Sequence, residues 1–101
     1  MLTIDKKLNG EEMVVGLTGR LDTTTAVDLD KELAGSYDGL KKLVFDLSKL
    51  EYVSSAGLRV FLGAHKRMAK IGGTMVISKP SKLVVDIFEV TGFANTLNIE
   101  D

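Results

Sequence analysis

The segment from Lys42 to Leu47 is nearly continuous in apolar residues, and it constrains the fold more than any other part of this chain. Such a run, here a strand from Leu43 to Leu47, predicts a central strand that is covered on both faces. A helical pattern follows from about Ala56 to Ile71, with four residues predicted to point inward: Leu58, Phe61, Leu62 and Met68. A buried strand followed by an amphipathic helix is typical of an α/β protein.

The N-terminal third of the chain predicts a β-hairpin and then a helix. Apolar residues alternate from Leu2 to Leu8 and again from Met13 to Leu17. Between them, Asn9-Gly10 is a strong signal for a type I′ turn. A helix is expected next, capped by Asp22 or one of Thr23 to Thr25 and stopped at Gly35, with three core residues: Ala26, Leu29 and Leu33.

The C-terminal third predicts a strand from Thr74 to Ser78, a helix that opens at Pro80-Ser81 and closes at Thr91-Gly92, and a short last strand or helix. We therefore expect one α/β domain over residues 1–101. Its mostly parallel sheet has four to five strands, an N-terminal antiparallel hairpin strand and flanking helices. A chain of 101 residues with 45% hydrophobic residues suffices for one core.

Paired serines, Ser54 and Ser55, stand where the strand gives way to the second helix. One interpretation is structural, because serine is among the preferred N-cap residues of helices. The other is a hydroxyl switch, because the free N–H groups and the dipole at a helix N-terminus stabilise an added phosphate. The residues three positions after the serines are Gly57 and Leu58 and not Glu or Gln, so no capping box supports the structural interpretation. The two interpretations can coexist.

Functional side chains of open α/β sheets gather at the carboxyl ends of the strands. We expect Asp22, Asp46 and Ser55 to emerge together at this rim. Capping of the first helix is an alternative role for Asp22.

Composition and charge argue against several classes of function. The net charge of −1 gives no electrostatic reason to expect nucleic acid or an anionic membrane as a partner, so a protein partner fits better. No cysteine is present, which leaves no disulfide or thiolate chemistry. The chain has no apolar run near 20 residues and no signal-peptide pattern, so we expect a soluble cytoplasmic protein.

Catalysis and cofactor binding are not expected either. Ser55 and His65 lie ten positions apart on one helix, about 15 Å at ~1.5 Å per residue, so they cannot form a triad with Asp46. One histidine without cysteine leaves only scattered carboxylates for a metal. The glycines match neither the P-loop nor the Rossmann spacing, and we expect no cofactor.

Nearly the whole chain resembles the STAS family, which includes bacterial anti-sigma factor antagonists. The resemblance rests on Gly19, Leu21 and Asp22, on Asp46-Leu47-Ser48, on Leu50, Tyr52 and Val53, and above all on Ser54-Ser55-Ala56-Gly57-Leu58. It implies that Ser55 is the phosphoacceptor, with Ser54 as the second candidate, and that Asp22, Asp46, Ala56 and Gly57 lie near the acceptor. This chain has Ser54 and Ala56 where the family usually has Asp and a hydroxyl residue.

The same resemblance implies partner switching by a non-enzymatic module. The unphosphorylated protein would bind an anti-sigma factor serine kinase and release a sigma factor, phosphorylation would end binding, and a protein phosphatase would restore it. The expected contact residues are Val53, Ser54, Leu58, Arg59 and Leu62. Alternatives are a constitutive STAS subunit of a transport or lipid-trafficking complex and a small-ligand or nucleotide sensor.

Overall fold

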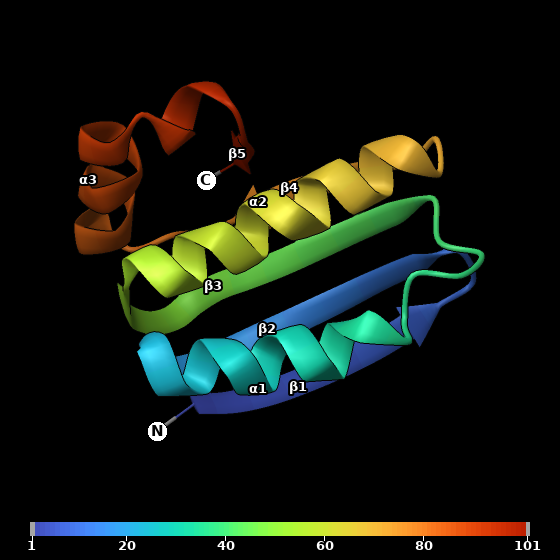
Figure 1. Ribbon diagram of the computed structural model, residues 1–101, viewed down its shortest axis with the longest axis horizontal. Helices are drawn as coiled ribbons and strands as arrows, with labels where there is room; N and C mark the ends of the chain where they lie inside the picture. Colours follow the sequence, from blue (N-terminus) through green and yellow to red (C-terminus); the bar gives the residue numbers. More distant parts are fainter. Residues whose placement is uncertain (1, 101) are drawn as a thin grey trace.

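The computed structural model describes residues 2–100, which form an α/β fold with one five-stranded sheet (Figure 1). The strands are β1 (Leu2–Asn9), β2 (Glu12–Leu21), β3 (Lys42–Val53), β4 (Thr74–Ser78) and β5 (Asn98–Glu100). The helices are α1 (Thr23–Ala34), α2 (Ser55–Lys70), α3 (Lys82–Thr91) and a short 3-10 helix, η1 (Phe93–Asn95).

The strands follow one another in the sheet in the order β1-β2-β3-β4-β5. Strand β1 is antiparallel to β2 through the Asn9-Gly10 turn, where Gly10 has a positive φ of 65°. All later pairs are parallel. The predicted fold is therefore confirmed, and the last element is an edge strand paired with Val76–Ser78 of β4.

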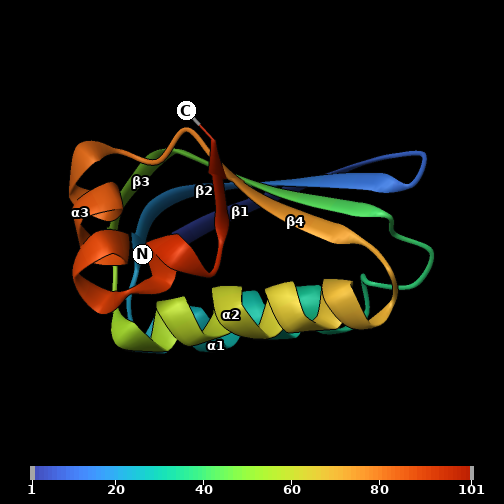
Figure 2. The ribbon, with the colours of Figure 1, turned by 90° about the horizontal axis from the view of Figure 1, so that it is seen from above.

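Helices α1 and α2 lie side by side on the same face of the sheet (Figure 2). The prediction that the central strand is covered on both faces was wrong. Leu43, Phe45 and Leu47 of β3 are buried under the helices, whereas Val44 and Asp46 point to the opposite face and are half-buried. The alternation was masked in the sequence because Val44 is apolar although it lies on the uncovered face.

Strand β3 is also longer than predicted, since it continues from Leu47 to Val53. The exposed polar residues Ser48 and Lys49 resemble a loop in the sequence, but Leu50 and Val53 are buried and keep the strand in the sheet. Strand β2 stays paired with β3 through two register shifts, one between Gly16 and Thr18 and one between Gly19 and Arg20. Pairing therefore persists to Leu21 beside Val53, and both strands end at one rim.

Three phenylalanines join the layers of the core. Phe61 of α2 packs edge-on against Phe45 of β3 at 4.9 Å between ring centroids, and against Phe88 of α3 at 6.1 Å. Met68 is also buried, as predicted, and so is Met75 of β4. His65 of α2 is half-buried, and its Nδ1 atom is shielded from solvent.

Candidate functional site

The two serines at the start of α2 have different structural roles. Ser54 is the N-cap, and its Oγ accepts a hydrogen bond from the Gly57 N–H at 3.2 Å. Ser55 is the first helical residue; it is exposed, and its hydroxyl makes no hydrogen bond within residues 2–100. The cap and the free hydroxyl are thus separate residues, so modification of Ser55 leaves the cap in place.

Gly57 brings the start of α2 close to the ends of β2 and β3. A Cβ at this position would lie 2.7 Å from Leu21 Cγ, 2.8 Å from Leu21 Cδ2 and 3.0 Å from Val53 Cγ1. Such distances are below van der Waals contact, so a larger residue would push the helix or the strands apart. Gly57 therefore positions Ser55, although it takes no part in chemistry itself.

Asp22 lies at the same rim as the serines. Leu21 is paired with Val53, and the Ser54 N–H donates to the Leu21 carbonyl at 2.8 Å, so Asp22 and Ser54 follow directly on neighbouring strands. Asp22 is also the N-cap of α1: its Oδ1 accepts from the Thr25 N–H at 2.9 Å and from the Thr25 hydroxyl at 3.0 Å. These bonds, chiefly the backbone one, hold the pKa of Asp22 below its ordinary value of 3.8.

Asp46 does not lie at this rim, and the expectation that it would be near the acceptor was wrong. It occupies the uncovered face within β3, seven residues before Val53, which corresponds to roughly 20 Å along an extended strand. Its Oδ1 accepts from the Ser48 N–H at 3.0 Å, and this bond lowers the pKa of Asp46. The error follows from the predicted end of β3 at Leu47.

The residues expected to contact a partner are only partly at the surface. Val53 and Leu58 are 2% and 3% exposed and belong to the core. Leu62 and Ser54 are half-buried, and Arg59 is exposed. Ala56, which was expected near the acceptor, is also half-buried.

A groove beside Ser55 contains residues that the sequence did not single out. It runs between α1 and α2, has a volume of about 320 Å³ and joins Ala56, Arg59 and Val60 of α2 with residues of α1: Thr23, Ala26, Val27 and Asp30. Val27 is 52% exposed. Because the groove exists only where the two helices pack, no local pattern marked Val27 and Asp30.

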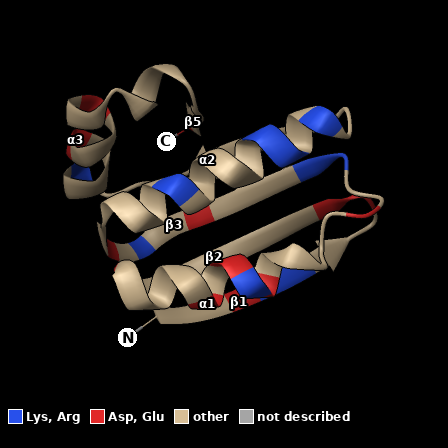
Figure 3. Cartoon of the chain, in the orientation of Figure 1, with Lys and Arg blue, Asp and Glu red and all other residues tan. Residues whose placement is uncertain are grey.

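The two helices that border the groove differ in charge (Figure 3). Helix α2 has no acidic residue and carries four basic ones: Arg59, Lys66, Arg67 and Lys70. Helix α1 carries three acidic residues and only one basic one: Asp28, Asp30, Glu32 and Lys31. The helical face is therefore divided into a basic half and an acidic half, and Ser55 lies at the N-terminus of the basic helix.

The described residues offer little for other chemistry. Between residues 2 and 100 there is no group of three or more His, Cys, Asp or Glu side chains arranged to hold a metal ion. None of the described helices is both long and apolar enough to cross a membrane. What this site presents is an exposed hydroxyl, a helix N-terminus and a groove.

A sequence model of the STAS domain matches residues 3–101, so the chain belongs to the STAS domain family. BtrV of Bordetella bronchiseptica, which is named as an anti-sigma factor antagonist, is 38% identical over 93 residues, covering 91% of this chain and 78% of BtrV. An anti-sigma factor antagonist from Mycobacterium paratuberculosis has a TM-score of 0.87 at 24% identity, covering 99% of this chain and 86% of that structure. The Bacillus cell fate determinant SpoIIAA in its phosphorylated form has a TM-score of 0.76 at 16% identity, covering 96% of this chain and 90% of that structure.

These similarities confirm the predicted family and the predicted fold. The relatives are named as anti-sigma factor antagonists, and such antagonists are regulatory proteins rather than enzymes.

Proposed function

We propose that this chain is a phosphorylation-controlled anti-sigma factor antagonist with Ser55 as the phosphoacceptor. In the unphosphorylated form it binds an anti-sigma factor that is also a serine kinase, and a sigma factor is thereby released. Transfer of phosphate to Ser55 ends this binding, and a protein phosphatase restores it. The protein itself catalyses no reaction.

The observation that carries the proposal is the division of roles between Ser54 and Ser55. A kinase must reach the hydroxyl that it modifies, and the Ser55 hydroxyl is exposed and unbonded within the described residues. Ser54 is half-buried and engaged in the cap. Names among the relatives agree with the proposal, since SpoIIAA is described in a phosphorylated form.

The position of Ser55 explains how one phosphate can act as a switch without unfolding the protein. Phosphate adds about −1.5 to −2 charges, and the N-terminus of α2 accommodates them because its first turn holds no acidic residue. The same charge changes the surface that a partner must cover. Affinity is lost because a charged group becomes desolvated at the interface without a matching donor.

The groove between α1 and α2 extends the contact surface beyond Ser55. Its exposed apolar side chain, Val27, lines the groove together with Asp30 of α1 and Arg59 of α2. We propose that the partner inserts an apolar side chain here and pairs with Arg59 through a carboxylate. Ser54 and Leu62 would lie at the edge of this contact, whereas Val53 and Leu58 support it from the core.

The proposal is tested with each anti-sigma kinase encoded in the same genome. Incubation with ATP is expected to add one phosphate to the wild type, mapped to Ser55 by mass spectrometry, and none to Ser55→Ala. Ser55→Asp is expected to bind the unmodified kinase more weakly by about 1–3 kcal/mol, the scale of a mispaired desolvated charge, as measured by calorimetry.

Ser54→Ala is the matched control for Ser55→Ala, because it removes the neighbouring hydroxyl. It is expected to accept phosphate while losing part of the helix cap, about 1 kcal/mol of stability. Phosphate mapped to Ser54 would show that Ser54, and not Ser55, is the phosphoacceptor. Equal binding of the kinase by the wild type and Ser55→Asp would contradict the switch and favour a constitutive STAS subunit.

A further inference from the structure

The face of the sheet opposite α1 and α2 carries a row of valines that no helix covers within residues 2–100 (Figure 2). Val14, Val44 and Val76 are direct neighbours across β2, β3 and β4. Val14 and Val44 are half-buried, and Val76 is 7% exposed. The register continues this row with Lys7 in β1 and Asn98 in β5, so the three valines form a short apolar strip between two polar ends.

Polar rows lie on both sides of this valine row. Two positions toward the C-terminal ends of the parallel strands, the register aligns Asp5, Gly16, Asp46, Ser78 and Glu100. Two residues in the other direction, it aligns Asn9, Glu12, Lys42 and Thr74. Because side chains two positions apart share a face, all three rows point the same way. The first row contains three carboxylates, and the second contains one carboxylate, Glu12, and one lysine, Lys42.

We propose that this face binds a second copy of the chain, with the two-fold axis along the valine row. Two sheets packed face to face lie about 10 Å apart, so the side chains of the two copies meet. Each valine then faces its own counterpart, and so does Lys7 at the β1 end of the row. Rotation about this axis places the row of one copy that holds Lys42 against the row of the other copy that holds Asp46.

Charge complementarity supports this orientation. Lys42 of each copy faces Asp46 of the other, which gives two equivalent ion pairs, as two-fold symmetry requires. Neither Lys42 nor Asp46 has an ion-pair partner within 4.0 Å among residues 2–100, so both are available. The alternative axis, parallel to the strands, would place Asp46 against Asp46 and Asp5 against Glu100. That axis would also place Lys42 against Lys42, so it brings more like charges together than the proposed axis, about which Lys7 faces its counterpart.

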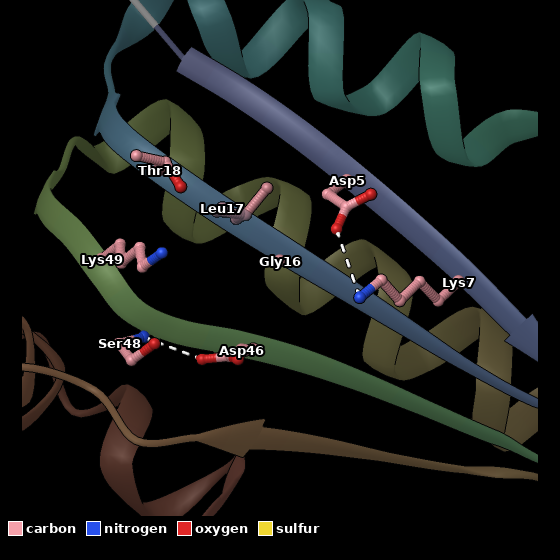
Figure 4. Close-up of a pocket in the computed structure, with 8 residues that line it drawn as sticks. All are labelled: Asp5, Lys7, Gly16, Leu17, Thr18, Asp46, Ser48 and Lys49. Carbon is pink, nitrogen blue, oxygen red and sulfur yellow. Dashed lines mark hydrogen bonds and ion pairs between the residues drawn. The ribbon is translucent and has the colours of Figure 1, made fainter.

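A hollow over Gly16 lies on the same face of the sheet (Figure 4). Its volume is about 240 Å³, and it lacks a side chain at its centre because residue 16 is glycine. Lys7 of β1 and Lys49 of β3 extend toward β2 on either side of it. Glu12 of the second copy faces Gly16 in the proposed dimer, so its side chain enters a hollow that is lined by two lysines, Lys7 and Lys49, and by two aspartates, Asp5 and Asp46.

The size of the face predicts a weak dimer. Five strands spaced ~4.8 Å apart and three rows of side chains span about 20 by 15 Å, or roughly 600 Å² over both copies, which is below the range of stable interfaces and corresponds to a transient one. Helix α2 lies on the other side of the sheet, so both copies keep Ser55 exposed. The dimer would present two exposed Ser55 hydroxyls, one on each copy.

Analytical ultracentrifugation of the whole protein tests the proposal. From about 10 µM to 1 mM, the range for weak interfaces, the average mass of the wild type is expected to rise from 10.9 kDa toward twice that value. Val44→Lys is expected to stay monomeric. Val90→Lys is the matched control, because Val90 is 87% exposed on α3, and it is expected to dimerise as the wild type does.

Exchange of the proposed ion pair tests the orientation. Lys42→Glu alone and Asp46→Lys alone each create two like-charge contacts and are expected to be monomeric. An equimolar mixture of the two variants restores the dimer, because the introduced carboxylate of one copy then faces the introduced ammonium group of the other. Circular dichroism verifies that each variant is folded.

A monomeric wild type at 1 mM, about the weak limit of such interfaces, would overturn the proposal. A dimer that Val90→Lys disrupts, or a mixture of the two charge variants that stays monomeric, would also overturn it.

Discussion

Gly57 and Gly63 lie on the same helix but in opposite surroundings. A Cβ at Gly57 would collide with Leu21 and Val53, whereas a Cβ at Gly63 would meet nothing within 4 Å. The first glycine is required for close packing of α2 against the strand ends. The second only adds conformational freedom to the unfolded chain, which folding must then remove.

Substitution of these two glycines by alanine is expected to have opposite effects. Gly57→Ala should lower the free energy of unfolding by roughly 1–3 kcal/mol, because the added methyl group forces Leu21 or the helix to move. Gly63→Ala, the matched control, should raise it by about 0.5–1 kcal/mol through helix propensity. Urea titration of both variants measures the difference. A stabilised Gly57→Ala would show that close approach does not govern this position.

At the level of elements, α1 and α2 start with different caps. Asp22 and Thr25 form a capping box at α1, in which the Asp22 N–H donates to the Thr25 hydroxyl at 2.9 Å. Ser54 alone caps α2. An ionised cap stabilises α1, and a neutral one leaves the N-terminus of α2 able to receive a negative charge.

The cap of α1 predicts a pH dependence of stability. The pKa of Asp22 in the folded protein is below 3.8, so the stabilisation is fully present above pH 3.8 and is lost as the pH falls through the lower folded-state value. The wild type is therefore expected to be more stable than Asp22→Asn at pH 7, with a gap that narrows below pH 3.8. Urea midpoints from pH 7 to about 2 measure this gap.

Asp28→Asn is the control for this comparison, since Asp28 is exposed on the same helix and makes no side-chain hydrogen bond within residues 2–100. A wild-type advantage of constant size down to the lowest pH would refute the charged-cap explanation.

In the whole molecule, Phe61 of α2 packs against both the sheet and helix α3. Its ring touches Phe45 of β3 and Phe88 of α3 from within α2. Phe61→Ala is expected to cost roughly 3–5 kcal/mol, because it opens a cavity where three elements meet. Chemical denaturation measures the loss, and Phe61→Leu should show a smaller loss of the same sign.

Leu83→Ala provides the comparison, because Leu83 is 54% exposed on α3 and its removal should change stability by no more than about 0.5 kcal/mol. Equal losses for Phe61→Ala and Leu83→Ala would mean that the aromatic cluster does not hold the layers together.

Local patterns in the sequence determined the elements and the helix with the two serines. The Asn9-Gly10 turn, the period of α2 and the Thr74–Ser78 strand were all recognisable, because turn chemistry and hydrophobic period act over a few residues. The STAS resemblance was recognisable from Ser54 to Leu58 for the same reason, since that motif is contiguous.

Only the tertiary structure decided which face of the sheet is covered, which serine caps α2 and what surrounds Ser55. The helices α1 and α2 both pack on one face, which leaves Val44 and Asp46 on the other. The groove with Val27 and Asp30 arises from residues about 30 positions apart in the chain, where two helices meet. Such features depend on how elements pack against one another, and a single segment carries no record of the surface that its neighbour presents.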